Sequence, residues 1–308
     1  MRRALFLLLL LLSAALCSGS GLAAESNTLL VLSDGAPAYE KTAQRIRERL
    51  IRLRPALRIE SLPLDKVTAT DLSNAALVVT IGTQAAESVV NMFQPDRLVC
   101  ALLTHQTYMR LPPARTGAQR SAVFIDQPAS RQVALIRIAL PQVKRLAAVY
   151  SEASRPLVDA IEVVARAHGL PVDAAAVSDD QPLYSALQRV LDRDAALLTV
   201  PDTSVYNNFT IQNVLLTAYR QRTPVVGFSP AYVRAGAVVA VYSTPEQVGD
   251  QVAEVAAAAL SGAPLPPPAY PVRFSVSTNA HVARSLSVPL LPPDVLEDEI
   301  RRRESLTP

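Results

Sequence analysis

The segment Ala76–Val90, ALVVTIGTQAAESVV, indicates the fold class most clearly. Its first six residues form an apolar, β-branched run of the length that a buried strand has. The turn residues Gly82, Thr83 and Gln84 follow at once, and the apolar residues beyond them return at helical spacing. A strand that passes through a glycine turn into a helix is typical of βαβ units, so the stretch predicts an α/β protein with a parallel sheet.

The same alternation continues on both sides of this stretch. Four further runs predict strands of the same sheet: Thr28–Leu32, Leu57–Leu62, Leu98–Leu103 and Ala122–Ile125. Between the first two, apolar residues four and three apart predict a helix that packs on the sheet: Tyr39, Ala43, Ile46, Leu50 and Leu53. The arginines between them would face solvent, so this first cycle predicts one complete α/β lobe.

A second cycle then repeats the order of parts. Helices are expected at Ser130–Leu140, in a segment that ends at His168 and Gly169, at Leu183–Leu191 and from about Asn208 to Arg220. Strands are expected at Leu146–Tyr150, Val172–Ala176, Ala195–Val200, Val225–Phe228 and Ala237–Val241. Two similar Rossmann-like lobes are the simplest account of this repetition.

The remaining segment predicts that the chain crosses between the two lobes several times. Pro245–Leu260 is an alanine- and valine-rich helix, Pro264–Pro268 a stiff linker, and the chain ends with one strand at Val272–Val276 and one helix at Asn279–Leu286. Three crossings are therefore expected, near Asp126, Tyr242 and Pro271. The N-terminal lobe would hold residues 25–125 with 244–269, and the C-terminal lobe residues 126–243 with 270–290. Residues 291–308 are expected to form a charged, solvated tail.

The N-terminus has the pattern of a signal peptide, assigned to residues 1–24. Arg2 and Arg3 precede the leucine-rich run Ala4–Leu12, which is too short to span a membrane. Cleavage is expected after Ala23 or Ala24, which places the protein in the periplasm. A lipid anchor on Cys17 is the rival interpretation, and the bulky Leu16 before it is against that processing.

Composition excludes several classes of function. The pI is about 9.0, but the net charge is only +3 and the cations are scattered without interleaved aromatics, so nucleic acid is not an expected partner. Cys100 is the one cysteine beyond the leader and lies in an apolar run, which predicts a buried thiol and no disulfide. The sequence lacks the common nucleophile, phosphate-loop, zinc and dinucleotide motifs. We therefore expect no catalytic residues, metal or cofactor, although carboxylate-only catalysis stays open.

Three segments carry a family resemblance: ALVVTIGTQAAESVV at 76–90, IALPQVKRLAAVYSEASRPLVDAIEVVARAHGLPV at 138–172, and RTPVVGFSPAYVRAGAVVAVYSTPEQVGDQVAEVAAAALSGAPLP at 222–266. The chain resembles the substrate-binding proteins of ABC transporters, and within them the group with tryptophan- and tyrosine-binding members. The resemblance spans nearly all of the chain beyond the leader. It implies a type I periplasmic-binding-protein fold of two hinged lobes, a small-molecule ligand and an ABC permease in the inner membrane as partner.

Loops at the carboxyl ends of parallel strands are where such sheets bind ligands. They hold Ser33, Asp34, Gly35, Gly82, Thr83, Gln84, Thr104 and His105 in the first lobe, and Ser151, Glu152, Asp202, Thr203, Tyr206, Phe228 and Ser229 in the second. Apart from Gly35 and His105, which is expected to be structural, these are the predicted ligand-binding residues. The resemblance supports Thr83, Ser151, Asp202 and Thr203. It also shows a departure, because relatives often have Asn-Pro where this chain has Ser151 and Glu152.

An amino acid would divide its groups among these loops. Thr83 and the neighbouring amides would bind its carboxylate, Asp202 its ammonium group, and Tyr206 or Phe228 its side chain. An ordinary alternative stays open, since serine, threonine and aspartate at these loop positions also cap helices without any ligand.

Two functions are compatible with this sequence. In the first, ligand closes the lobes and the closed form docks on the permease. In the second, the same fold is a sensor or scaffold that docks on another membrane receptor, a sensor kinase or an envelope assembly partner.

Overall fold

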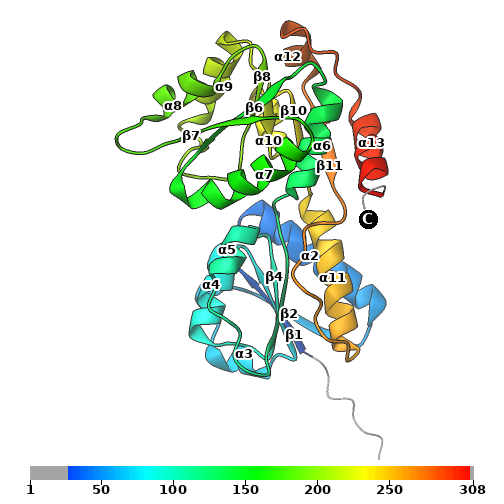
Figure 1. The fold of residues 1–308 in the computed structure, drawn as a ribbon. Helices are drawn as coiled ribbons and strands as arrows, with labels where there is room; N and C mark the ends of the chain where they lie inside the picture. Colours follow the sequence, from blue (N-terminus) through cyan, green and yellow to red (C-terminus); the bar gives the residue numbers. More distant parts are fainter. Residues whose placement is uncertain (1–26, 306–308) are drawn as a thin grey trace, which may run out of the picture.

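The structure is a computed structural model that describes residues 27–305, and its two lobes are stacked one above the other (Figure 1). The first lobe has a parallel sheet in the order β2-β1-β3-β4-β5. Its strands are β1 (Asn27–Leu32), β2 (Arg58–Pro63), β3 (Leu77–Ile81), β4 (Arg97–Ala101) and β5 (Gln119–Val123). All five residues of β3 are buried, as the apolar run in the sequence predicts.

Helices cover both faces of this sheet. One face carries α3 (Ala69–Asn74), α4 (Thr83–Met92) and α5 (His105–Arg110), and the other carries α2 (Pro37–Leu53) and α11 (Pro245–Leu260). A 3-10 turn, η1 (Leu64–Lys66), precedes α3. The apolar stripe of α2 is buried through Ala43, Ile46 and Leu50, as its spacing predicts, whereas Leu53 at the helix end is exposed.

The second lobe repeats the strand order and adds one strand, giving β7-β6-β8-β9-β10-β11. Its strands are β6 (Arg145–Tyr150), β7 (Val172–Ala176), β8 (Ala195–Leu198), β9 (Val225–Gly227), β10 (Val239–Tyr242) and β11 (Ser275–Thr278). Its helices are α6 (Ala129–Ala139), η2 (Glu152–Ser154), α7 (Arg155–Ala167), α8 (Leu183–Val190), α9 (Ile211–Arg220), α10 (Pro230–Ala235) and α12 (Ala280–Ser285). The sheet is parallel except for β11, which runs antiparallel to β10. Both lobes thus have the doubly wound order in which ligands bind at the switch point between the first and third strands.

The chain passes between the sheets three times, after β5, after β10 and after α11. The third passage begins beside the first sheet, where Phe124 N–H donates to Ala269 O at 3.1 Å. Gln127 on the first passage donates through Nε2 to Ser243 Oγ on the second at 2.9 Å. The Ser243 hydroxyl donates in turn to Arg273 O on the third at 2.7 Å. The three passages are therefore tied to one another at the waist of the molecule.

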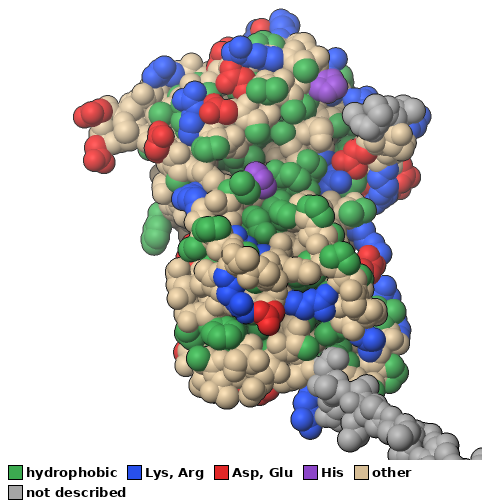
Figure 2. Space-filling view, turned by 60° about the horizontal axis from the view of Figure 1, so that its bottom comes forward, with side chains coloured by type: hydrophobic (Ala, Val, Ile, Leu, Met, Phe, Trp, Pro, Cys, Tyr) green, Lys and Arg blue, Asp and Glu red, His purple; other side chains and the backbone are tan. Residues whose placement is uncertain are grey.

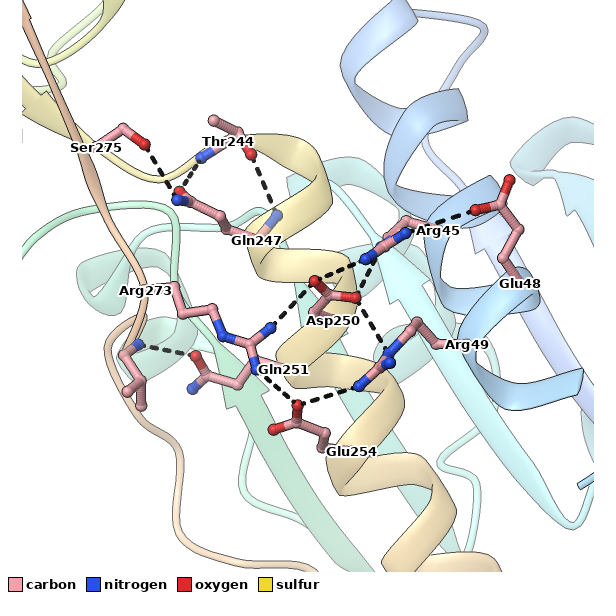
Figure 3. A network of polar contacts seen from close by, with 11 residues as sticks. Arg45, Glu48, Arg49, Thr244, Gln247, Asp250, Gln251, Glu254, Arg273 and Ser275 are labelled. Carbon is pink, nitrogen blue, oxygen red and sulfur yellow. Dashed lines mark hydrogen bonds and ion pairs between the residues drawn. The ribbon is translucent and has the colours of Figure 1, made fainter. Parts of the chain in front are cut away.

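Helix α11 is held in place by an ionic network that Figure 3 shows from close by. Asp250 accepts from Arg45 Nε of α2 at 2.7 Å and from Arg273 Nη1 of the third passage at 3.0 Å. Arg49 and Arg273 also pair with Glu254, one turn further along α11. Next to Asp250, Gly249 lets the two helices approach closely, since a Cβ there would lie 2.9 Å from Arg45 Cβ.

The prediction of a solvated tail at 291–308 is wrong for most of its length. Residues Pro293–Ser305 form α13, which packs on α6 and β11 and buries Leu296 and Ile300 completely. Arg131 of α6, only 5% exposed, donates through Nε to Glu304 Oε1 at 2.6 Å and lies over the Phe274 ring at 4.2 Å. The charge pattern of α13 was visible in the sequence, but its two apolar residues four apart were the signal for docking.

Two further expectations concern the membrane and Cys100. No helix within residues 27–305 has the length and apolarity that crossing a bilayer requires. The predicted signal peptide, its cleavage sites and Cys17 lie outside the described residues.

The Cys100 thiol is fully buried in β4, and this burial raises its pKa to about 11, so it is an inert core residue as predicted.

Candidate functional site

A cleft of about 1000 Å³ lies between the lobes, at the carboxyl ends of both sheets. The loops after β1, β3 and β4 line it on one side, and the loops after β6, β8 and β9 line it on the other. Figure 2 shows hydrophobic side chains gathered across the waist between the lobes. Nine of the predicted ligand-binding residues line the cleft: Ser33, Asp34, Thr83, Gln84, Thr104, Asp202, Thr203, Tyr206 and Phe228.

The first-lobe wall is built around Ser33 and Gly82, which follow the adjacent strands β1 and β3. Ser33 Oγ donates to Ile81 O at 3.1 Å and accepts from Ala85 N–H at 2.9 Å, so it caps α4 from a neighbouring loop. Gly82 has a φ of +96°, and a Cβ there would lie 2.5 Å from Ser33 Oγ. The capping alternative therefore holds for the Ser33 hydroxyl, and Gly82 shapes the wall without lining it.

The start of α4 presents two free N–H groups to the cleft. The first N–H groups of a helix have no acceptor within it. Ser33 Oγ takes the N–H of Ala85 and Gly82 O takes that of Ala86. The N–H groups of Thr83 and Gln84 have no acceptor in the described part of the chain. They are suited to an anionic group, and Arg110 of α5 lines the same cleft.

Thr104 and His105 start α5. Thr104 Oγ1 accepts from Thr107 N–H at 3.1 Å, so it caps this helix while it lines the cleft. His105 stacks with Tyr270 and meets the edge of Phe124, with ring centroids 5.8 and 5.1 Å apart. It does not line the cleft, in keeping with the structural role expected for it.

Asp202 has five donors within the protein and is 7% exposed. Its Oδ2 accepts from Ser151 N–H, Ser151 Oγ and Ser154 Oγ at 2.9, 2.7 and 2.5 Å. Burial acts to raise the pKa of this carboxyl group, but the hydrogen bonds from Ser154 and Ser151 outweigh it and hold the pKa below its ordinary value. The carboxylate therefore ties the loops after β6 and β8 together, which leaves little capacity for an ammonium group.

Aromatic residues form the floor of the second-lobe wall. Tyr206 is 4% exposed and its hydroxyl donates to Val149 O at 2.9 Å, so its polar end points into the core. Phe228 packs on Tyr232 with ring centroids 4.4 Å apart. The Tyr232 hydroxyl donates to Tyr206 O at 3.2 Å, and burial raises its pKa to about 12. Phe228 and Tyr232 thus offer an apolar surface to a ligand.

Four predicted residues lie outside the cleft lining: Gly82, Ser151, Glu152 and Ser229. Glu152 is exposed on η2, and Ser229 lines a separate cavity behind the cleft. The cleft lining also includes residues that were not predicted from the sequence: Tyr39, Gln106, Thr107, Arg110, Ala153, Ser154, Pro201, Ser204, Asn207, Asn208, Ile211, Ala231, Tyr232 and Ala235. Most of these residues follow a predicted residue by a few positions, often by one helical turn. Helical spacing could therefore have predicted them.

A side-chain hydrogen bond joins the two lobes across the cleft. Gln106 Nε2 of α5 donates to Ala153 O of η2. Within residues 27–305 no cluster of three histidine, cysteine or acidic side chains could hold a metal ion.

Comparisons with known proteins agree with this architecture. The chain matches the family of ABC transporter substrate binding proteins over residues 68–283. No curated protein sequence matches it significantly. Among solved structures, a ligand-free, open substrate-binding protein with adhesive properties from Clostridium difficile has a TM-score of 0.69 at 16% identity, covering 86% of this chain and 96% of its own.

Two further solved structures have a TM-score of 0.61 over 89% of this chain and 98% of theirs. One is a conserved domain protein from Vibrio cholerae at 19% identity. The other is a domain in complex with L-tryptophan, from the pneumococcus Streptococcus pneumonia, at 18% identity. At these identities the likeness shows the two-lobed binding-protein fold that the sequence predicted. Because the family match covers more than half of its length, the chain belongs to the family of ABC transporter substrate-binding proteins.

Proposed function

We propose that the protein captures a small molecule in the cleft between its lobes and delivers it to an ABC permease, without catalysis. The observation that carries the proposal is the cleft of about 1000 Å³. It lies at the switch points of two matched sheets and is at the upper end of the range typical of small-molecule sites. The leader pattern at residues 1–24 supports the periplasm as the place where this happens.

Capture by closure follows from how the lobes are joined. Three chain passages, tied through Gln127, Ser243 and Arg273, leave the lobes free to hinge while restricting twist. A ligand that contacts both walls stabilises the closed state because only that state offers both sets of contacts. The closed surface would be what the permease recognises.

The cleft chemistry favours an amino acid as the ligand. The free N–H groups of Thr83 and Gln84, with Arg110, suit its carboxylate, and Phe228 with Tyr232 suits an apolar side chain. The complex of the pneumococcal neighbour with L-tryptophan is in keeping with this class.

The test is a thermal-shift screen of the purified protein against amino acids, sugars and other small metabolites, followed by small-angle X-ray scattering of each hit. A ligand raises Tm by an amount that grows with the logarithm of its concentration above Kd, and closure lowers the radius of gyration. Ala231→Trp fills the cleft and should abolish both effects, whereas Ala280→Trp, at an exposed position at the start of α12, should keep them. Hits that survive Ala231→Trp, or no hit at all, would count against capture in this cleft.

A further inference from the structure

A second cavity of about 200 Å³ lies behind the cleft, at the hinge. It shares Phe228 and Pro201 with the cleft, so the two spaces meet at these side chains. Its far wall is formed by the first two chain passages, through Asp126 and Ser243. Any molecule that enters it touches the hinge itself.

Asp126 is the one acid in the lining of this cavity, and it is 6% exposed. Its Oδ1 accepts from His105 N–H at 2.9 Å. Among residues 27–305, the hydrogen-bond donors to this carboxylate are backbone N–H groups, and the His105 imidazole acts on it electrostatically. Burial raises its pKa, and this effect outweighs the backbone hydrogen bonds and the His105 imidazole, which act to lower it. Asp126 is thus an incompletely partnered carboxyl group.

Asp126 differs from Asp202 in the number of donors around its carboxyl group. Asp202 also follows a strand and is also buried, but five donors surround it. The rest of the hinge cavity supplies Asp126 with no cation, because its polar members are amides and hydroxyls such as Gln132 and Ser229. A buried ionised carboxylate is stabilised when a cation pairs with it. An ammonium group inside the cavity would supply such a cation.

We propose that Asp126 binds the ammonium group of an amine ligand, whose apolar part packs on Phe228 where the hinge cavity and the cleft meet. This inference rests on the proposed function and narrows its ligand to compounds with a basic nitrogen. It replaces Asp202, to which the sequence reasoning gave the ammonium group. A ligand bound in this way bridges the first chain passage and the second-lobe wall, so its charged group contacts the hinge directly.

The cavity size fixes which part of the ligand enters. About 200 Å³ is below the usual size of a whole small-molecule site, so the cavity suits the amine end of a larger ligand. The remainder extends past Phe228 into the cleft. A carboxylate on the same ligand would then face the α4 N–H groups and Arg110.

The experiment measures affinity by calorimetry for three matched sets: the L-amino acids, their decarboxylated amines and their deaminated acids, with neutral sugars as a fourth set. On the unaltered protein, binders should come only from the two sets with an amine, and each deaminated acid should bind at least tenfold more weakly than its amino acid. Asp126→Asn keeps an acceptor for His105 N–H and removes the charge. It should weaken every amine binder at least tenfold.

Two further variants sharpen the test. Asp180→Asn, in the exposed turn before α8, should leave affinities unchanged. Asp34 is the competing cleft carboxylate, so a loss of amine affinity in Asp34→Asn with none in Asp126→Asn would overturn the inference. A sugar or a deaminated acid among the tight binders would overturn it as well, while capture itself would stand. Absence of any binder would remove the proposed function together with the inference.

Discussion

Gly82 holds the first-lobe wall in shape, and its replacement by alanine should be costly. Its φ of +96° is unfavourable for alanine, and the added Cβ would collide with Ser33 and Tyr39. We expect Gly82→Ala to lower the free energy of unfolding by about 1–3 kcal/mol in urea titrations. Gly262 has the same φ of +96°, but a Cβ added there would meet nothing within 4 Å, so Gly262→Ala measures the backbone cost alone. Equal losses in both variants would show that the contacts are irrelevant.

Asp202 should make stability depend on pH in a defined direction. Its folded-state pKa lies below the ordinary 3.8, so its contribution is fully present above that value and is lost as pH falls through the lower, folded pKa. We expect Asp202→Asn to cost about 1.5–3 kcal/mol at pH 7 and progressively less below pH 4. Urea unfolding across pH 2–7 measures this. A deficit that stays constant down to the acid limit would contradict it, and exposed Asp180→Asn should show no deficit.

For single residues, the sequence indicated which loops meet but not which partners their side chains hydrogen-bond. Ser33 and Asp202 were predicted as ligand contacts from their loops, yet their hydrogen bonds go to neighbouring loops. Those partners, 52 and 51 residues away in the chain, depend on strand order, which local spacing does not encode. Asp126 was predicted only as the place of a crossing for the same reason.

Among the elements, α13 behaves as part of the second-lobe core. Ile300 is fully buried, so Ile300→Ala should lower the free energy of unfolding by about 2–5 kcal/mol. Val295 on the same helix is 44% exposed, and Val295→Ala should stay within about 0.5 kcal/mol. Chemical denaturation followed by circular dichroism measures both. Similar small losses in the two variants would mean that the helix is detached in solution.

The strands and long helices were predictable because each carries a strong period. The fully buried β3 and the amphipathic α2 lie where their patterns place them. Short helices such as α5 and α10, of six residues each, were missed because a turn and a half holds too few apolar positions to show a period. The antiparallel direction of β11 was also invisible, since direction is set by the route of the third passage.

For the molecule as a whole, we expect the contact from Gln106 to Ala153 to favour the closed arrangement of the lobes. A partly exposed hydrogen bond contributes about 0.5–1.5 kcal/mol, so Gln106→Ala should shift the balance toward the open state by about 2- to 10-fold. Small-angle scattering of the ligand-free protein would show a larger radius of gyration, with Tm nearly unchanged. Gln188→Ala, which removes only a contact within α8, is the matched control. An identical scattering profile for both variants would exclude this role.

The late position of α11 along the chain has a consequence for biosynthesis. Val248, Val252 and Ala256 close one face of the first sheet, packing with residues such as Leu30 and Val99. A growing polypeptide therefore finishes the second lobe's parallel strands before the first lobe can bury that face completely. Until α11 emerges, the nascent first lobe exposes apolar surface to which chaperones can bind. Any product terminated before Pro245 keeps that surface exposed.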